Sequence, residues 1–181
     1  PIYYYLSGLA NFKAENYGDA RKSLARYLKI NPNNLRAVEM VATIHLRSGA
    51  PLAANALLNK TNLNHPNNPN VLNLLGLANL QLDNFDRADF YFSEVIRLVP
   101  ESPIGLLNLA RSNIRAQQYE KGISLLLKAQ KAGLPEIDTK LLLLDAYTNA
   151  GRLESAVAIS TELVEQFPES ANLMQKHGAI L

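Results

Sequence analysis

The sequence predicts an all-α fold in which pairs of antiparallel helices stack along one axis as a solenoid. Two observations predict it: a proline that recurs at a step of 34 residues, and small residues that recur at the same step. The prolines are Pro32, Pro66 and Pro100, and Pro168 follows at twice that step. Self-similarity at a period of this size is typical of repeat proteins, in which each unit packs only on its neighbours.

The 34-residue step divides the chain into five complete repeats and the first helix of a sixth. The complete repeats are residues 1–34, 35–68, 69–102, 103–136 and 137–170, and the partial one is 171–181. We therefore predict a single array over residues 1–181. Because the chain opens without an initiator methionine and its last apolar helix has no partner helix, we expect it to be a fragment of a longer protein.

Each repeat is expected to form a helix, a short turn and a second helix. The first helix of the third repeat shows one face at helical spacing, formed by Leu72, Leu75, Gly76 and Asn79. Turn residues in "LDNFD" separate it from the second helix. The proline then ends the second helix, because it has no N–H to donate and its ring clashes with the preceding turn.

Two columns of small residues mark where the helices of a pair approach each other. Position 8 of successive repeats is Gly8, Ala42, Gly76, Ala110, Leu144 and Gly178. Position 20 is Ala20, Ala54, Ala88, Gly122 and Ala156. We expect these two positions to face each other, since larger side chains there would hold the two helices apart.

These columns resemble the tetratricopeptide repeat (TPR) family over the whole chain. The resemblance extends to a bulky residue at position 17, which is Tyr17, Phe85 and Tyr119, and to the proline at position 32. Position 4, usually aromatic in the family, departs from it in all repeats but the first and is Lys140 in the fifth. The resemblance implies a right-handed superhelix of helix pairs. In it the first helices line a concave groove and the second helices form the convex side.

The composition argues against several classes of function. A net charge of +2 with scattered basic residues does not suggest nucleic-acid binding, and no apolar run approaches the roughly 20 residues that span a bilayer. The chain has no cysteine, and His45, His65 and His177 fall at unrelated positions of their repeats. No catalytic or phosphate-binding motif occurs. We therefore predict that the chain is not an enzyme and has no metal or cofactor.

The candidate site is the face of the first helices that the resemblance makes concave, at positions 2, 5, 9, 12 and 13. Its residues are Tyr5, Leu9, Phe12, Lys13, Arg36, Arg47, Asn73, Leu77, Leu80, Leu107, Arg111, Ile114 and Arg115. Exposed aliphatic surface usually marks a binding site, so we expect these residues to contact a peptide or helix while the arginines pair with its acidic groups. The alternative is that the curvature of the array buries the aliphatics between adjacent first helices.

The predicted function is a non-catalytic interaction scaffold that binds a protein or peptide partner in this groove. The Lys and Asn clamp with which chaperone-binding members of the family hold a C-terminal carboxylate is missing from every possible starting repeat. A co-chaperone of that type is therefore not expected. The alternative is a regulatory or substrate-docking repeat domain of an enzyme whose catalytic domain lies outside these residues.

Segments such as "ARYLKINPNN" and "HLRSGAP" also resemble bacterial TPR lipoproteins of exopolysaccharide and exosortase (PEP-CTERM) systems. This resemblance implies a periplasmic or envelope-attached protein, and the alternative is a cytoplasmic assembly scaffold. Direct membrane insertion by this segment is not expected. The bare faces at Tyr3 to Tyr5 and at Met174 to Leu181 lead us to expect end-to-end self-association through the terminal repeats.

Overall fold

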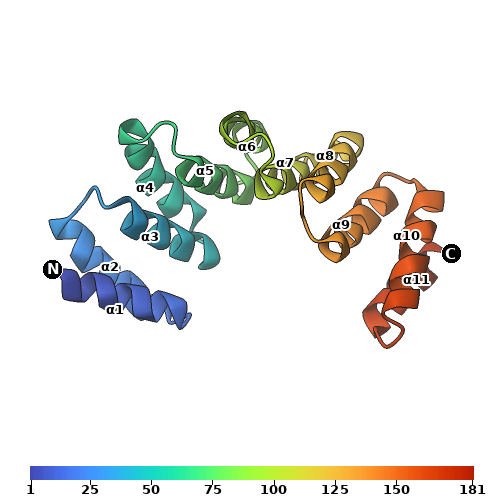
Figure 1. Cartoon of the computed structure of the whole chain (residues 1–181), viewed down its shortest axis with the longest axis horizontal. Coiled ribbons are helices and arrows are strands. Elements are labelled where there is room, and N and C mark those ends of the chain that lie inside the picture. Colours follow the sequence, from blue (N-terminus) through green and yellow to red (C-terminus); the bar gives the residue numbers. More distant parts are fainter. The chain divides into compact units, whose positions relative to one another are not determined.

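The computed structural model describes residues 1–181 as eleven α-helices, with no strand. The first helices of successive repeats are α1 (Ile2–Lys13), α3 (Leu35–Arg47), α5 (Pro69–Gln81), α7 (Pro103–Arg115), α9 (Glu136–Asn149) and α11 (Ala171–Ile180). The second helices are α2 (Tyr17–Ile30), α4 (Pro51–Asn64), α6 (Phe85–Leu98), α8 (Tyr119–Lys131) and α10 (Leu153–Gln166). The helices of a repeat lie side by side, as α1 and α2 do at the blue end of Figure 1. The predicted all-α solenoid of helix pairs is confirmed.

The helices group into two compact units, Pro1–Leu98 and Val99–Leu181. The first unit contains α1 to α6 and the second contains α7 to α11. In the first unit, a core cluster joins Leu24 of α2 to Ile44 of α3. In the second, a cluster joins Leu126 of α8 to α9. Part of the core of each unit thus lies between a second helix and the first helix of the next repeat. That the two units form one continuous array stays a prediction.

Proline ends the second helices as the sequence predicts. Helices α2, α4, α6 and α10 end two residues before Pro32, Pro66, Pro100 and Pro168. The fourth repeat differs, because its proline is one residue late. There α8 ends at Lys131, Gly133 adopts a left-handed φ of 102°, and Pro135 becomes the N-cap residue of α9. A glycine that tolerates positive φ thus ends the helix where the proline is displaced.

The turn inside the repeat has the same geometry in all five complete repeats. Residue 15 of each repeat has a positive φ: Glu15 (60°), Gly49 (67°), Asp83 (56°), Gln117 (62°) and Gly151 (71°). The N–H of residue 16 donates to the carbonyl of residue 11, as from Gln118 to Asn113 at 2.8 Å. The N–H of residue 15 donates to the carbonyl of residue 12, as from Gln117 to Ile114 at 3.0 Å. This is the Schellman arrangement, which ends a helix with one left-handed residue.

We expect Gln117→Gly to raise the free energy of unfolding by about 0.5–1 kcal/mol. A residue with a Cβ is strained at this φ, and glycine removes the strain. Glycine also raises the conformational entropy of the unfolded chain, which offsets part of the gain in stability. Gly151→Ala is the matched control with the opposite sign. A Cβ there meets no atom within 4 Å, so any loss must come from the backbone. Urea unfolding measures both changes, and a Gln117→Gly protein less stable than the parent would contradict the expectation.

The packing of the two helices in a repeat includes one contact that was not expected, between positions 8 and 24. A Cβ placed on Gly76 would overlap the ring of Phe92, and Gly8 meets position 24 in the same way, so position 8 is opposed by position 24. The Cβ of a helical residue tilts toward the N-terminus of its helix. Because the two helices of a repeat are antiparallel, the N-terminal part of the first helix lies beside the C-terminal part of the second helix, where position 24 is. Position 20 faces position 8 at the backbone in the fourth repeat, since a Cβ on Gly122 would be 3.2 Å from the carbonyl oxygen of Ala110 and would also meet the side chain of Ile114.

Candidate functional site

The candidate site is the face of the first helices at positions 2, 5, 9, 12 and 13, together with the residues that neighbour them. We name it the first-helix face. Nine of the thirteen predicted residues lie in the first unit, on α1, α3 and α5, and four lie in the second, on α7. The two sets are described separately.

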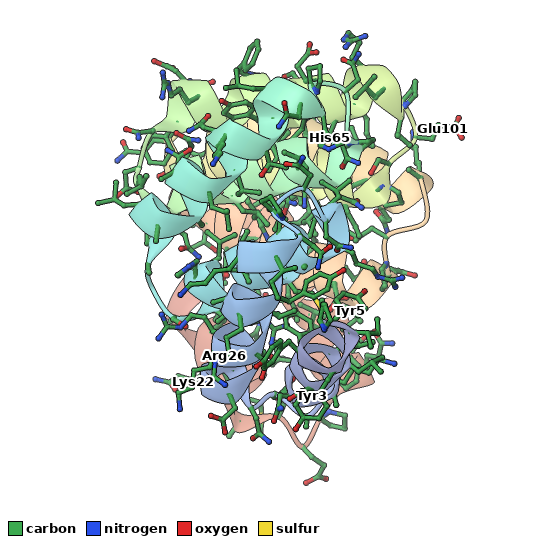
Figure 2. All side chains as sticks on the ribbon, turned by 90° about the vertical axis from the view of Figure 1, so that its left-hand side faces the viewer. Tyr3, Tyr5, Lys22, Arg26, His65 and Glu101 are labelled. Carbon is green, nitrogen blue, oxygen red and sulfur yellow. The ribbon has the colours of Figure 1, made fainter.

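The apolar residues of α1 take part in the core of the first unit. Tyr5, Leu9 and Phe12 are partly buried against the cluster between α2 and α3. The ring centroid of Tyr5 lies 5.1 Å from that of Tyr27 on α2. Figure 2 shows Tyr5 and Tyr3 on opposite sides of α1, and Tyr3 is exposed. On α1 these side chains therefore take part in packing within the chain, and their contact with a partner stays a prediction.

The aliphatic residues of α5 and α7 are also largely covered. Leu77 is partly buried against the core cluster of α3, α4 and α5, and Leu80 is only 7% exposed. Leu107 and Ile114 are partly buried against the cluster that contains Leu126. Neighbouring helices, including the second helices α4 and α8, therefore cover part of these side chains, and their contact with a partner stays a prediction.

The polar members of the predicted site differ in what they contact. Asn73 is half-buried, and the exposed cations are Lys13, Arg36, Arg47, Arg111 and Arg115. The guanidinium of Arg47 lies over the ring of Tyr17 at 5.2 Å, donates a hydrogen bond to its hydroxyl, and is 3.8 Å from the carboxylate of Glu15. Arg47 therefore ties α3 to the turn of the first repeat.

Glu39 is a titratable group on the first-helix face that the predicted site does not include. It is half-buried on α3, and this burial raises its pKa, while a side-chain hydrogen bond with Asn70 and the charge of Arg36 act in the opposite sense. Glu39 stands at position 5 of its repeat and Asn70 at position 2 of the next. These two columns of α3 and α5 are therefore neighbours, and the face continues from one first helix to the next.

We expect Glu39→Gln to stabilise the protein at neutral pH and to have little effect in acid. Because the pKa is raised in the folded state, that state binds the proton more tightly than the unfolded chain does. The parent therefore loses stability as the pH rises from about 4 through the raised pKa, and the glutamine variant does not. Urea unfolding between about pH 4 and pH 7 measures the divergence. Glu101→Gln, at an exposed position, is the control, and parallel curves for parent and Glu39→Gln would contradict the expectation.

The second unit contains a hollow on the first-helix face, between α9 and α11. Its volume is about 510 Å³. It is lined by Ile137, Leu141, Asp145, Phe167, Ser170, Asn172, Leu173 and Lys176. Leu141 is 36% exposed and Phe167 is 39% exposed, so the apolar part of the lining faces water. We name this feature the α9–α11 hollow.

An ion pair forms one polar edge of the hollow. Nζ of Lys176 on α11 lies 2.6 Å from Oδ1 of Asp145 on α9. Leu141 and Asp145 occupy positions 5 and 9 of the fifth repeat, so they belong to the columns used for the predicted site, although that site does not include them. The columns were the signal that could have found them. Phe167 lies in the segment between α10 and α11. The columns of the first helices could not identify it, because it belongs to no first helix.

Two of the histidines lie on helices of the array, His45 on α3 and His177 on α11. Nδ1 of His177 lies 2.8 Å from the hydroxyl of Ser160, within hydrogen-bonding distance. His45 is half-buried on α3, where burial, with a smaller contribution from the charge of Arg21, lowers its pKa. No group of three or more His, Asp and Glu side chains is placed to hold a metal ion. None of the helices is both long and apolar enough to cross a membrane.

Comparison with known families matches most of the chain to one repeat type. Two sequence models of the tetratricopeptide repeat match residues 11–78 and 73–136, which together span more than half of the chain. No curated protein gives a significant match to the sequence.

Solved structures share the fold at low sequence identity. PilW, a widely conserved type IV pilus biogenesis factor, is 19% identical with a TM-score of 0.85, over 95% of this chain and 80% of that one. MamA of Desulfovibrio magneticus RS-1 is 16% identical with a TM-score of 0.80, over 93% and 96%. TTC0263, a thermophilic TPR protein of Thermus thermophilus, is 19% identical with a TM-score of 0.75, over 96% and 94%. At these identities the likeness concerns the fold alone.

Proposed function

Because this chain belongs to the tetratricopeptide repeat family, we propose that it binds a peptide or helix segment of a partner protein on its first-helix face. The family and its structural neighbours support a protein-interaction scaffold. The kind of segment that is recognised and the face on which it binds are our proposal.

The observation that carries this proposal is the α9–α11 hollow. Its volume of about 510 Å³ falls in the range of sites that bind small ligands and large side chains. Leu141 and Phe167 present apolar surface to water there, and both line the same hollow. The adjoining Asp145 and Lys176 can orient the backbone or polar groups of a bound segment.

We further propose that the full protein works in assembly at the bacterial envelope. The sequence resemblance to envelope lipoproteins supports this, and so does the fold shared with PilW, itself a pilus biogenesis factor. The N-terminal region encoded by the gene tests it. A signal peptide followed by a lipobox cysteine is the expected result, and an N-terminus with no export signal would overturn the envelope assignment.

The binding proposal is tested by selecting peptides from a displayed random library on the purified chain. Enriched peptides are then measured against Leu141→Arg and against Leu127→Arg as the matched control. Leu127 is 40% exposed on α8, so both variants place the same charge at an equally exposed leucine, one in the hollow and one on a second helix. We expect Leu141→Arg to weaken binding by at least about tenfold, because it removes the apolar contact, and Leu127→Arg to leave it unchanged.

Two results would count against the proposal. A library that yields no enriched peptide would show that the chain does not recognise short segments. Peptides that bind the parent and Leu141→Arg equally would place recognition outside the hollow. Circular dichroism of both variants shows whether each keeps its helices, so a loss of binding is not confused with unfolding.

A further inference from the structure

The second unit also presents a cation in the columns of the first-helix face. Arg111 occupies position 9 of the fourth repeat and Asp145 position 9 of the fifth, so the two side chains leave equivalent points of successive first helices. Arg111 is exposed, and no carboxylate of the second unit forms an ion pair with it. A segment lying across α7, α9 and α11 would therefore meet a cation on α7 and an apolar hollow beyond α9.

The charges within the hollow are already matched. Lys176 pairs with Asp145 at 2.6 Å, so this edge carries no net charge. The remaining large side chains of the lining are Ile137, Leu141, Phe167 and Leu173. A charged group entering there would lose hydration without gaining a free partner, whereas an apolar side chain would gain contact. The hollow therefore selects an apolar side chain, and Arg111 selects an acidic one.

We propose that the second unit recognises an acidic segment that places one large apolar side chain in the hollow and an Asp or Glu against Arg111. This inference rests on the proposed function and adds the chemistry of the partner. Arg111 lies on α7 and the hollow lies between α9 and α11, so the bound segment would cross α9 between its acidic and its apolar residue. An extended chain, which advances about 3.3 Å per residue, needs several residues to do so.

The test uses two labelled synthetic peptides of about twelve residues in a Gly-Ser background. One carries Leu and, four residues away, two consecutive glutamates; the other carries lysines in place of the glutamates. Fluorescence anisotropy with the whole chain should show the glutamate peptide binding at least about fivefold more tightly. Arg111→Glu should reverse this preference. Lys128→Glu makes the same charge change at an exposed position of α8 and should leave the preference unchanged.

The outcomes separate this inference from the proposed function. Library-selected peptides that depend on Leu141 but show no acidic preference, and no response to Arg111→Glu, would overturn the inference and leave the proposed function intact. Equal losses in Arg111→Glu and Lys128→Glu would indicate an effect of net charge and would also overturn it. If no selected peptide depends on Leu141, the proposed function itself fails.

Discussion

Leu144→Ala is expected to lower the free energy of unfolding by about 2–5 kcal/mol. Leu144 stands at position 8 of the fifth repeat, where it is 1% exposed and forms a core cluster with Ala156 and Leu163. The residue at position 24 of that repeat is Ser160, which is also buried. Serine is too small to fill the space that the leucine would leave. The variant would therefore contain a cavity whose lining atoms lose their packing partners.

A second substitution should recover part of this loss. Ser160→Leu combined with Leu144→Ala reproduces the pairing of the second repeat, where Ala42 and Leu58 occupy positions 8 and 24 and are both fully buried. Recovery should be incomplete, because the variant loses the contact of the Ser160 hydroxyl with His177 at 2.8 Å. Equilibrium urea unfolding of both single variants and the double variant measures the coupling. Additive effects would show that positions 8 and 24 do not share one packing space.

Gly76→Ala is expected to destabilise the protein by about 1–2 kcal/mol. The new methyl group would lie 2.7 Å from Cδ1 of Phe92, whose side chain is fully buried, so the ring or one of the two helices would have to shift. The greater helix propensity of alanine offsets part of the cost. Phe92→Leu in the same chain should relieve the overlap, because the resulting pair again matches Ala42 with Leu58.

Gly178→Ala is the matched control for this prediction. It makes the same substitution at position 8 of the last helix, where a Cβ meets no atom within 4 Å. It should stabilise the chain by up to about 1 kcal/mol through helix propensity alone. If Gly76→Ala were as favourable as Gly178→Ala, the close approach of α5 and α6 would not require glycine at that position.

The sequence alone determined the repeat, the helices and their ends. Prolines stop α2, α4, α6 and α10. The left-handed residue of each turn was not predicted, because no single residue type is shared by Glu15, Gly49, Asp83, Gln117 and Gly151. The helix ends at the prolines depend on the backbone chemistry of a few consecutive residues, so the proline column of the sequence predicts them directly. For this reason the departure at position 4, such as Lys140, leaves the helix pair unchanged: Lys140 instead forms ion pairs with Glu136 and Glu162 on α9 and α10.

Only the tertiary structure decided which residues of a column are covered and which are open. Tyr5 and Leu141 both occupy position 5 of a repeat. Tyr5 packs on Tyr27 of α2, whereas Leu141 faces the α9–α11 hollow, whose lining includes Phe167. The difference arises from side chains on other helices and turns, about 20 or more residues away along the chain. Position in the repeat sets the direction of a side chain, but exposure depends on the size of every neighbour that packs beside it, and those sizes vary between repeats.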